Sequence, residues 1–337
     1  MNHNVTALFR QDTLNHDERQ GPSKSNPGGG LSTKKRQLSK ALPQIQFVNE
    51  ADKMGAISIV DVLYFSGGKT AEERDRRIET YCNHEGMKIL WTADFEILRW
   101  LPEHRDKIFD STDVIAANSC YMRQLLSGYF EDSKIALLTD PVDTNISEGV
   151  KKRKKEIYAC SQVMLEKGID EVISLYRILG IGNHSERELN KVFIGSSETW
   201  GIPMKDTDSF QLELQLEEVC DNFHWSLPPL KVHEIARRAW ILVSFARFES
   251  FGYSVAEAML GGCHIFAIRH GAYLKRIEAG VITPIDNAID ARHKIKPFIT
   301  DQEPIRNEAA IEYVHENYAL PVFREQFRQI VGGLYGI

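Results

Sequence analysis

Hydrophobic positions along this chain form short continuous runs, separated by longer segments with a helical period. Ile57–Phe65, Lys88–Thr92 and Trp240–Ala246 are compact apolar runs, which is typical of strands buried on both faces of a parallel sheet. Segments such as Thr70–Asn83 and Ile169–Leu179 instead read as helices with a polar and an apolar side. This alternation predicts an α/β fold built from doubly wound parallel sheets.

Composition adds a broad class to this picture. The 337 residues are 42% hydrophobic and 26% charged, which suggests a soluble globular protein with two domains of ordinary size. The net charge of −6 argues against a generally basic nucleic-acid binder. No apolar run approaches the ~20 residues that span a bilayer, and the N-terminal residues do not resemble a signal peptide. We therefore expect a cytoplasmic protein, in the host cytoplasm if it is viral, with no membrane span.

Cysteine and histidine spacing gives no sign of a metal site or a disulfide framework. The five cysteines are widely spaced, and none forms a C-x-x-C pair. The eleven histidines show no H-E-x-x-H pattern. We expect reduced thiols and no bound metal.

One stretch carries the strongest local signals. Trp240–Ala246 predicts a strand, and His264–Ile268 predicts the next one. Between them Ser254 and Glu257 have the spacing of a capping box, so we expect Ser254 to be the N-cap of a helix. Gly261 then ends that helix, as glycines at C-termini do.

Two carboxylates flank the start of this helix. Glu249 and Glu257 have seven residues between them, and Phe251 and Gly252 complete an E-x-F-G sequence. The unit resembles the E-x7-E signature of the glycogen-synthase-like family of retaining, nucleotide-sugar glycosyltransferases with the GT-B fold. This resemblance implies two Rossmann-like domains that face each other across a cleft. On the residues alone, Glu257 is equally compatible with a helix cap and Glu249 with a solvated loop acid.

The chemistry of this unit suits a sugar nucleotide. A helix N-terminus attracts phosphate, and Gly252 lets a backbone approach a ligand closely. A carboxylate accepts hydrogen bonds from sugar hydroxyls. The resemblance would place Glu249 on the donor sugar and Glu257 on the nucleotide ribose. The other residues of the unit that we assign to donor binding are Arg247, Phe251, Tyr253 and Ser254.

A second motif supplies a candidate cation. Relatives carry G-R-L-x-x-E-K-G-x-D after the first strand of the second domain, and Lys167 matches the lysine that holds the donor diphosphate there. Gln162 stands where the family has an arginine, which removes one positive charge, and Arg247 is a candidate for compensation. We expect Lys167 and the helix dipole to stabilise the leaving diphosphate without a metal.

Evidence for the first domain is weaker. Gly29 and Gly30 belong to a glycine-rich segment that resembles the P-x-G-G turn facing the donor phosphates, although a flexible linker has the same composition. Asp94 follows the strand Lys88–Thr92 and is a candidate for the acceptor side of the site, or else an Asx turn or N-cap. The basic run at residues 151–155 is either a solvated linker or a contact for a polyanionic acceptor such as DNA or RNA.

These observations lead to one expected function and two alternatives. We expect an acceptor-side domain at 1–148, a nucleotide-sugar domain at 149–318 and a C-terminal helix at 319–337 that crosses back to the first domain. The expected activity is retaining transfer of a sugar from a nucleoside-diphosphate sugar, with a UDP-sugar as the expected co-substrate, to an acceptor hydroxyl. The alternatives are a phage-type glycosyltransferase that acts on hydroxymethylated DNA bases, and a sugar-nucleotide-binding or scaffold protein without catalysis, which the departure at Gln162 motivates.

Overall fold

The computed structural model describes most of the chain and divides it into two compact units. The described residues are 5–8, 30–48, 51–67, 70–92, 102–146, 153–196, 208–225, 227–301 and 303–335. The first unit consists of residues 1–16, 34–141 and 320–337, and the second of residues 17–33 and 142–319. Each unit contains one six-stranded sheet in which every pairing is parallel. This arrangement confirms the predicted α/β class.

The first sheet has the strand order β2-β1-β3-β4-β5-β6, so the order in which strands are added reverses between β1 and β3. Its strands are β1 (Val5–Leu8), β2 (Gln46–Val48), β3 (Ile57–Asp61), β4 (Met87–Thr92), β5 (Val114–Ala117) and β6 (Ile135–Leu137). All described residues of β3, β4 and β5 are buried, as expected for strands that are covered on both faces.

Five helices accompany this sheet among the described residues. They are α2 (Gly30–Ala41), α3 (Ala71–Cys82), α5 (Pro102–Asp110), α6 (Cys120–Ser127) and α15 (Leu320–Tyr335). The hydroxyls of Thr70 and Ser119 cap α3 and α6 by accepting backbone N–H groups. The last helix, α15, is fixed to this unit because Phe323 packs against Trp91 at a ring-centroid distance of 5.7 Å.

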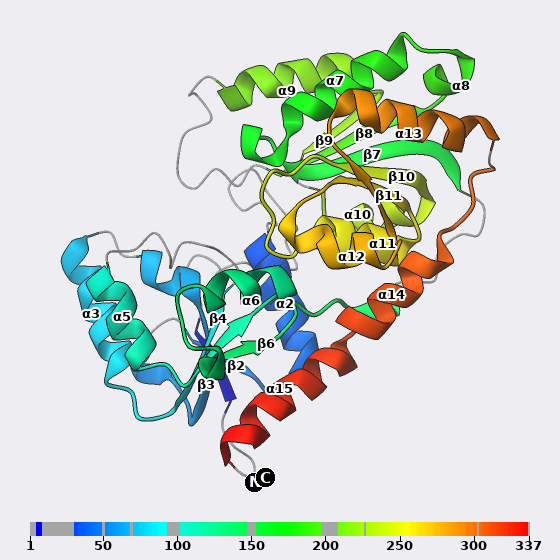
Figure 1. Ribbon diagram of the computed structural model, residues 1–337. Coiled ribbons are helices and arrows are strands. Elements are labelled where there is room, and N and C mark those ends of the chain that lie inside the picture. Colours follow the sequence, from blue (N-terminus) through cyan, green and yellow to red (C-terminus); the bar gives the residue numbers. More distant parts are fainter. Residues whose placement is uncertain are drawn as a thin grey trace. The chain divides into compact units, whose positions relative to one another are not determined.

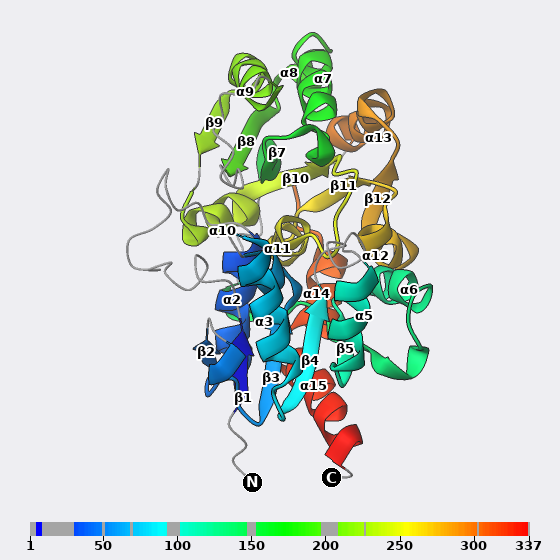
Figure 2. The ribbon, with the colours of Figure 1, turned by 90° about the vertical axis from the view of Figure 1, so that its left-hand side faces the viewer.

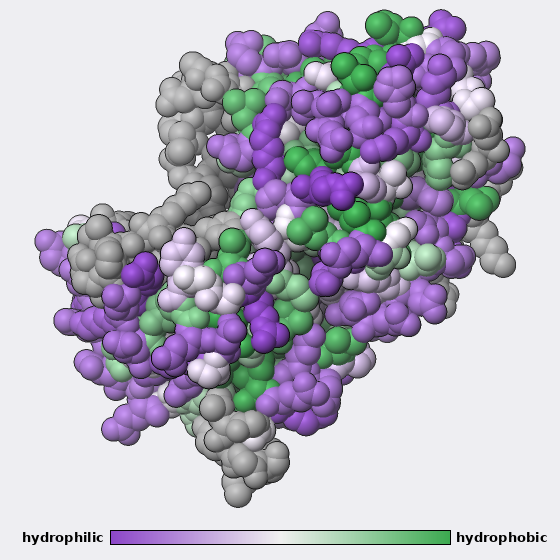
Figure 3. All heavy atoms as spheres, viewed as in Figure 1, coloured by the Kyte–Doolittle hydropathy of each residue, from purple (hydrophilic) through white to green (hydrophobic). Residues whose placement is uncertain are grey.

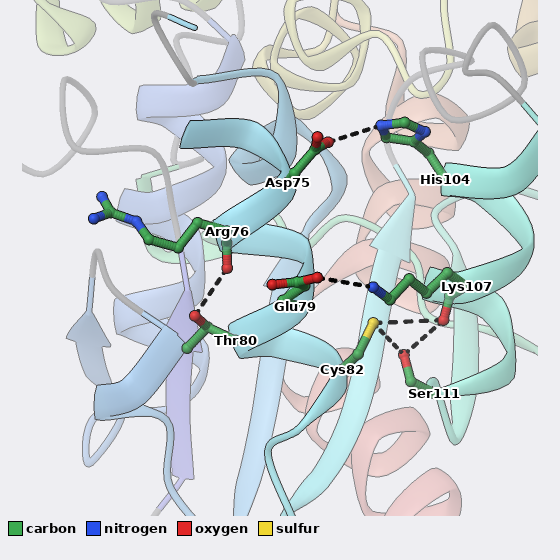
Figure 4. Close-up of polar contacts among 8 residues, drawn as sticks. All are labelled: Asp75, Arg76, Glu79, Thr80, Cys82, His104, Lys107 and Ser111. Carbon is green, nitrogen blue, oxygen red and sulfur yellow. Dashed lines mark hydrogen bonds and ion pairs between the residues drawn. The ribbon is translucent and has the colours of Figure 1, made fainter. Parts of the chain in front are cut away.

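Helices α3 and α5 lie side by side and are joined by polar contacts (Figures 1 and 4). The ring of His104 lies 3.0 Å from the carboxylate of Asp75, and the ammonium of Lys107 lies 3.5 Å from that of Glu79. The hydroxyl of Ser111 is 3.2 Å from the Cys82 sulfur. These exposed pairs align the two helices but add little to stability.

The second sheet has the strand order β12-β11-β10-β7-β8-β9. Its strands are β7 (Lys154–Gln162), β8 (Asn190–Ser196), β9 (Asn222–Trp225), β10 (Ala239–Ser244), β11 (His264–Ile268) and β12 (Ile282–Ile285). The strands are added to one side of β7 from β7 to β9 and to the other side from β10 onward, so β7 and β10 are neighbours at the centre of the sheet and the order of strands reverses between them. Ligands bind at such a reversal in doubly wound sheets.

Helices cover the two faces of the second sheet (Figures 1 and 2), and each face has its own hydrophobic core. One face carries α7 (Ile169–Gly180), α8 (His184–Arg187), α9 (Asp208–Val219) and α13 (Ala288–Asp301). The other face carries α10 (Pro229–Arg238), α11 (Tyr253–Gly261), α12 (Leu274–Glu278) and α14 (Glu308–Tyr318). Because both faces are covered, polar side chains that serve a ligand are restricted to the ends of the strands.

The run predicted as a single strand at Ile57–Phe65 is shorter in the structure. Strand β3 ends at Asp61, and residues Val62–Gly67 form a 3-10 helix. The Asp61 carboxylate is almost fully buried and accepts a hydrogen bond from the Lys34 ammonium at 2.7 Å. A buried charge needs such a partner, and this pair lies where the strand ends, although the sequence beyond it remains apolar.

The basic run at residues 151–155 is not a continuous charged surface in its described part. Arg153 is 4% exposed, and its guanidinium donates to the backbone oxygens of Ala236 and Gly261. Lys155 pairs with Glu188 at 3.2 Å. Residues 151 and 152 lie outside the described residues. The interpretation of this run as a solvated linker or a nucleic-acid contact is therefore wrong for Arg153, which packs inside the second unit.

The surface drawn in Figure 3 is mainly polar, as expected when most apolar residues pack in internal cores. Hydrophilic residues predominate on the face drawn in Figure 3, with hydrophobic residues in small groups among them. Within the described parts of the chain, no helix has the length and hydropathy needed to cross a membrane.

One buried carboxylate makes stability depend on pH. Glu186 is fully buried and accepts from the Arg292 guanidinium at 2.6 Å and from the Asn183 backbone at 2.7 Å. The hydrogen bond from Arg292 lowers the pKa of Glu186, although burial opposes this. Because the folded pKa lies below the unfolded value of about 4.3, the charged form stabilises the protein above that pH.

We expect Glu186→Gln to lower the unfolding free energy at pH 7 by about 1–3 kcal/mol, because bonds from a charged donor are weakened. The deficit should shrink as the pH falls below about 4, where the native carboxylate is also protonated. Thermal denaturation at several pH values tests this, with the half-exposed Glu188→Gln as control. A deficit that stays constant down to pH 3 would show that Glu186 does not act through its charge.

Candidate active site

Three loops meet at the carboxyl ends of neighbouring strands in the second sheet. They follow β7, β10 and β11, which are adjacent in the strand order. Residues 163–168 form the first loop and contain the 3-10 helix Leu165–Lys167. Residues 245–252 form the second, and residues 269–273 the third. Most of the candidate residues predicted for the donor lie on these loops or directly beside them.

The two residues predicted to be catalytic are in direct contact. The Lys167 ammonium donates to Glu249 Oε1 at 2.6 Å and to the backbone oxygen of Phe248 at 3.3 Å. Both charged side chains are about one-fifth exposed, at 19% for Lys167 and 21% for Glu249. The structure therefore brings a lysine and a carboxylate together at the edge of the sheet, although 82 positions separate them.

A glycine makes this contact possible. Gly168 has a φ of 66°, in the left-handed region, and any Cβ there would lie 2.1 Å from the backbone oxygen of Phe245. Only glycine fits such an approach. The loop after β7 can therefore lie directly against the loop after β10, which places Lys167 beside Glu249.

Arg247 fastens the same two loops together. Its guanidinium donates to the Asp170 carboxylate at 2.6 Å and to the backbone oxygen of Leu165. The backbone N–H of Arg247 donates to the backbone oxygen of Glu166 at 2.9 Å. The hydrogen bond with Asp170 raises the pKa of Arg247. The sequence suggested Arg247 as a substitute for the missing arginine at Gln162, whereas this structure commits its guanidinium to the partner loop.

The helix after the second loop begins differently from the prediction. Helix α11 starts at Tyr253 with Gly252 as its N-cap, and no side chain caps it. The expected capping box between Ser254 and Glu257 is therefore wrong. Gly252 has a φ of 78°, and a Cβ there would lie 2.8 Å from the Tyr273 ring. The turn and the close approach require glycine, so the backbone rather than a serine hydroxyl sets the helix start.

Phe251 and Tyr253 support this turn from inside the unit. Phe251 is 2% exposed and packs edge-on against Tyr253 and Tyr318 at ring distances of 5.1 and 5.0 Å. The buried Arg276 guanidinium lies 4.8 Å from the Phe251 ring and donates to the Tyr318 hydroxyl at 3.0 Å. The structure thus places Phe251 in the core, where it holds Gly252 and Glu249 in position.

Glu257, the second acid of the motif, lies in the second turn of α11 and is 9% exposed. Its carboxylate is 3.9 Å from Nε2 of His233 on α10. Burial raises the pKa of the nearby Cys160 to about 12, and the charge of Glu257 acts in the same direction. Cys160 is therefore a neutral thiol at ordinary pH. The two acids of the motif lie in separate surroundings: Glu249 contacts Lys167, and Glu257 faces His233.

Sequence reasoning missed two residues on the third loop. The ring of His270 packs edge-on against Phe248 at 5.8 Å, and burial lowers its pKa, with Lys167 acting in the same direction and Glu249 against it. The Tyr273 hydroxyl lies 3.3 Å from that of Ser244, the last residue of β10. His270 follows the predicted strand His264–Ile268, so the rule that ligands gather at strand ends could have identified it.

The remaining candidates lie elsewhere or beyond the described residues. Gln162 is the last residue of β7 and is half-buried. Gly30 is the first residue of α2. Gly29 and Asp94 lie outside the described residues. Within the part of the chain that the structure describes, no three His, Cys, Asp or Glu side chains gather as a metal site.

Comparison with known families identifies the class of this chain. A family model described as glycosyl transferases group 1 matches residues 143–316, more than half of the chain. The chain therefore belongs to the group 1 glycosyl transferases. The match covers nearly all of residues 142–319 of the second unit, including both acids of the motif and Lys167.

Similar proteins support the fold over a longer range. The sucrose synthase of Melioribacter roseus is 34% identical over 112 residues, which is 30% of this chain but only 14% of that enzyme. The sucrose-phosphate synthase of Thermosynechococcus elongatus has a TM-score of 0.75 at 11% identity, covering 98% of this chain and 99% of that one. Anabaena HepE, solved with UDP-glucose, has a TM-score of 0.66 at 11% identity, with 99% of both chains covered. These likenesses confirm the predicted GT-B fold of two Rossmann-like domains.

The geometry of Gly252 leads to a stability prediction. We expect Gly252→Ala to destabilise the protein by about 1–3 kcal/mol, because alanine at this φ is strained and its Cβ meets the Tyr273 ring. Gly180→Ala is the matched control, since its Cβ would meet nothing within 4 Å. That control should leave stability unchanged or raise it by up to about 1 kcal/mol. Thermal denaturation of both variants decides the matter, and equal midpoints would contradict the prediction.

Proposed function

We propose that this chain is a retaining glycosyltransferase that moves a sugar from a nucleoside-diphosphate sugar, with UDP-sugar as the expected donor, to an acceptor hydroxyl. The observation that carries the proposal is the contact between Lys167 and Glu249 at the reversal point of the second sheet. A cation and a carboxylate at one place match the two halves of such a donor, since phosphate needs positive charge and sugar hydroxyls need acceptors. The UDP-glucose bound to the structurally similar HepE supports the same class of donor.

The reaction requires stabilisation of negative charge on the leaving diphosphate. The bond between the anomeric carbon and the phosphate oxygen breaks, and its electron pair remains on the diphosphate. A bond forms from the acceptor oxygen to the anomeric carbon, and the acceptor hydroxyl gives its proton to the departing phosphate oxygen. In this proposal Lys167 and the N-terminus of α11 meet the growing charge, because an ammonium group and the positive end of a helix dipole both attract phosphate.

The acids have separate roles in this proposal. Glu249 accepts hydrogen bonds from the donor sugar and orients its anomeric carbon. Glu257 holds the ribose, with the neighbouring imidazole of His233 available to orient its carboxylate. Gly252 lets the diphosphate approach the backbone at the start of α11, while Phe251 anchors that turn by packing in the core against Tyr318.

Arg247 and Gln162 set the strength of the phosphate site. Gln162 can contribute a hydrogen bond but no charge. Arg247 holds the two loops together through the backbone oxygens of Leu165 and Glu166 and also pairs with Asp170 of α7, so we assign it a positioning role in donor binding. With Lys167 as the principal cation, loss of that one side chain should affect the reaction strongly.

The proposal is tested by removing each half of the Lys167–Glu249 contact. We expect Lys167→Ala to reduce kcat by about 10²–10³-fold, the scale for loss of one charge-stabilising donor. Glu249→Ala should reduce kcat/KM for the donor by about 100-fold through loss of sugar orientation. Release of UDP from UDP-glucose, with and without a panel of hydroxyl acceptors, measures both effects. Lys155→Ala is the matched control, because this lysine also pairs with a glutamate but lies at the start of β7.

Two outcomes would contradict the proposal in different ways. Full activity in both variants would remove Lys167 and Glu249 from the reaction. Tight binding of UDP-sugars by the native protein without turnover for any acceptor would instead favour a sugar-nucleotide-binding protein, the alternative that Gln162 motivates. A thermal-shift panel of nucleotide sugars should come first, because a ligand that binds only the native state raises the melting temperature.

A further inference from the structure

The cation of the proposed phosphate site already has an anionic partner. Lys167 pairs with Glu249 at 2.6 Å, and Arg247 on the neighbouring loop pairs with Asp170 at the same distance. A third basic residue, Arg269, follows β11 and is exposed. The positive charges of Lys167 and Arg247, which would attract a diphosphate, are therefore each balanced by a carboxylate.

A diphosphate and Glu249 compete for the same ammonium group. The Lys167 side chain is 19% exposed, and one of its donors is already used on the Phe248 backbone oxygen. A second donor is used on Glu249, so a phosphate must either displace Glu249 or accept from the third donor beside the negative charge of Glu249. Like charges at such short distance in a partly desolvated place are strongly unfavourable.

The cost of displacing Glu249 depends on what the nucleotide carries. A bare nucleoside diphosphate takes Lys167 from Glu249 and offers that carboxylate no donor in return. It leaves a half-buried charge unpaired beside the phosphates. A nucleotide with an attached sugar brings hydroxyl groups, which are donors that can replace the lysine as partners of Glu249.

We propose that Glu249 is a specificity-determining residue that competes with the diphosphate for Lys167 and so favours a sugar-bearing nucleotide over the free nucleotide. This inference rests on the proposed function and adds a second role to Glu249. After transfer the sugar has left, Glu249 loses its hydroxyl partners and returns to Lys167. The same contact therefore weakens the hold on the product nucleotide and promotes its release.

The test measures the affinities of UDP and UDP-glucose separately, by titration calorimetry without an acceptor. The variant is Glu249→Gln, which keeps the shape of the side chain and removes its charge. We expect it to bind UDP about tenfold more tightly than the native protein does, and UDP-glucose no more tightly. The ratio of the two affinities should fall by about tenfold or more, where tenfold corresponds to about 1.4 kcal/mol.

Glu188→Gln is the matched control for the change in net charge. Glu188 also pairs with a lysine, Lys155, at 3.2 Å, but that pair is about half exposed and lies at the opposite end of β7. It should leave both affinities unchanged. Parallel thermal denaturation of the variants shows whether each is folded.

A second comparison isolates the competition itself. Lys167→Met removes the group for which Glu249 and phosphate compete. In that background, adding Glu249→Gln should no longer strengthen UDP binding by tenfold. A gain that persists without Lys167 would mean that Glu249 repels phosphate generally, and would overturn the proposed competition.

The outcomes also separate this inference from the proposed function. If native protein and variants bind neither UDP nor UDP-glucose, the proposed function fails and the inference fails with it. If the native protein binds both ligands and Glu249→Gln binds UDP equally or more weakly, the donor site stands and the inference alone is refuted.

Discussion

The ion pair between Lys167 and Glu249 is the contact on which the candidate site depends. It joins the loops after β7 and β10, the two adjacent strands between which the order of strands in the sheet reverses. Gly168 allows the loops to touch, and Arg247 ties them together through the backbone oxygens of Leu165 and Glu166. Ammonium and carboxylate groups that are only about one-fifth exposed lose much of their hydration, so each needs the other as a partner. The second unit therefore has an ion pair between Lys167 and Glu249 at the carboxyl end of its sheet.

The arrangement of cores explains why the functional groups gather there. Helices cover both faces of the second sheet, and each face has its own apolar core. Along the strands themselves, ionisable side chains avoid a large desolvation cost most easily at the strand ends, where loops meet water. Even the aromatic residues of the motif follow this division, because Phe251 turns into the core while Glu249, two residues earlier, faces the site.

Much of the fold and part of the site could be predicted from local patterns. Short apolar runs marked the central strands, and the motif around Glu249 and Lys167 marked the loops that the structure brings together. The start of α11 and the burial of Arg153 could not be predicted in this way. Gly252 replaces the expected serine cap because Tyr273, from a later loop, occupies the space that any Cβ would need. His270 was overlooked for a similar reason, since its neighbours Phe248 and Glu249 come from another loop.

By itself the sequence determined the α/β class, the positions of the central strands, and the residue types available for a sugar nucleotide. Hydrophobic period and glycine positions are local properties, so a linear chain displays them directly. Only the tertiary structure decided which carboxylate reaches Lys167, which acid Arg247 serves, and that Arg153 is buried among backbone oxygens. Those choices depend on distances between residues far apart in the chain, which the packing of helices on the sheet creates.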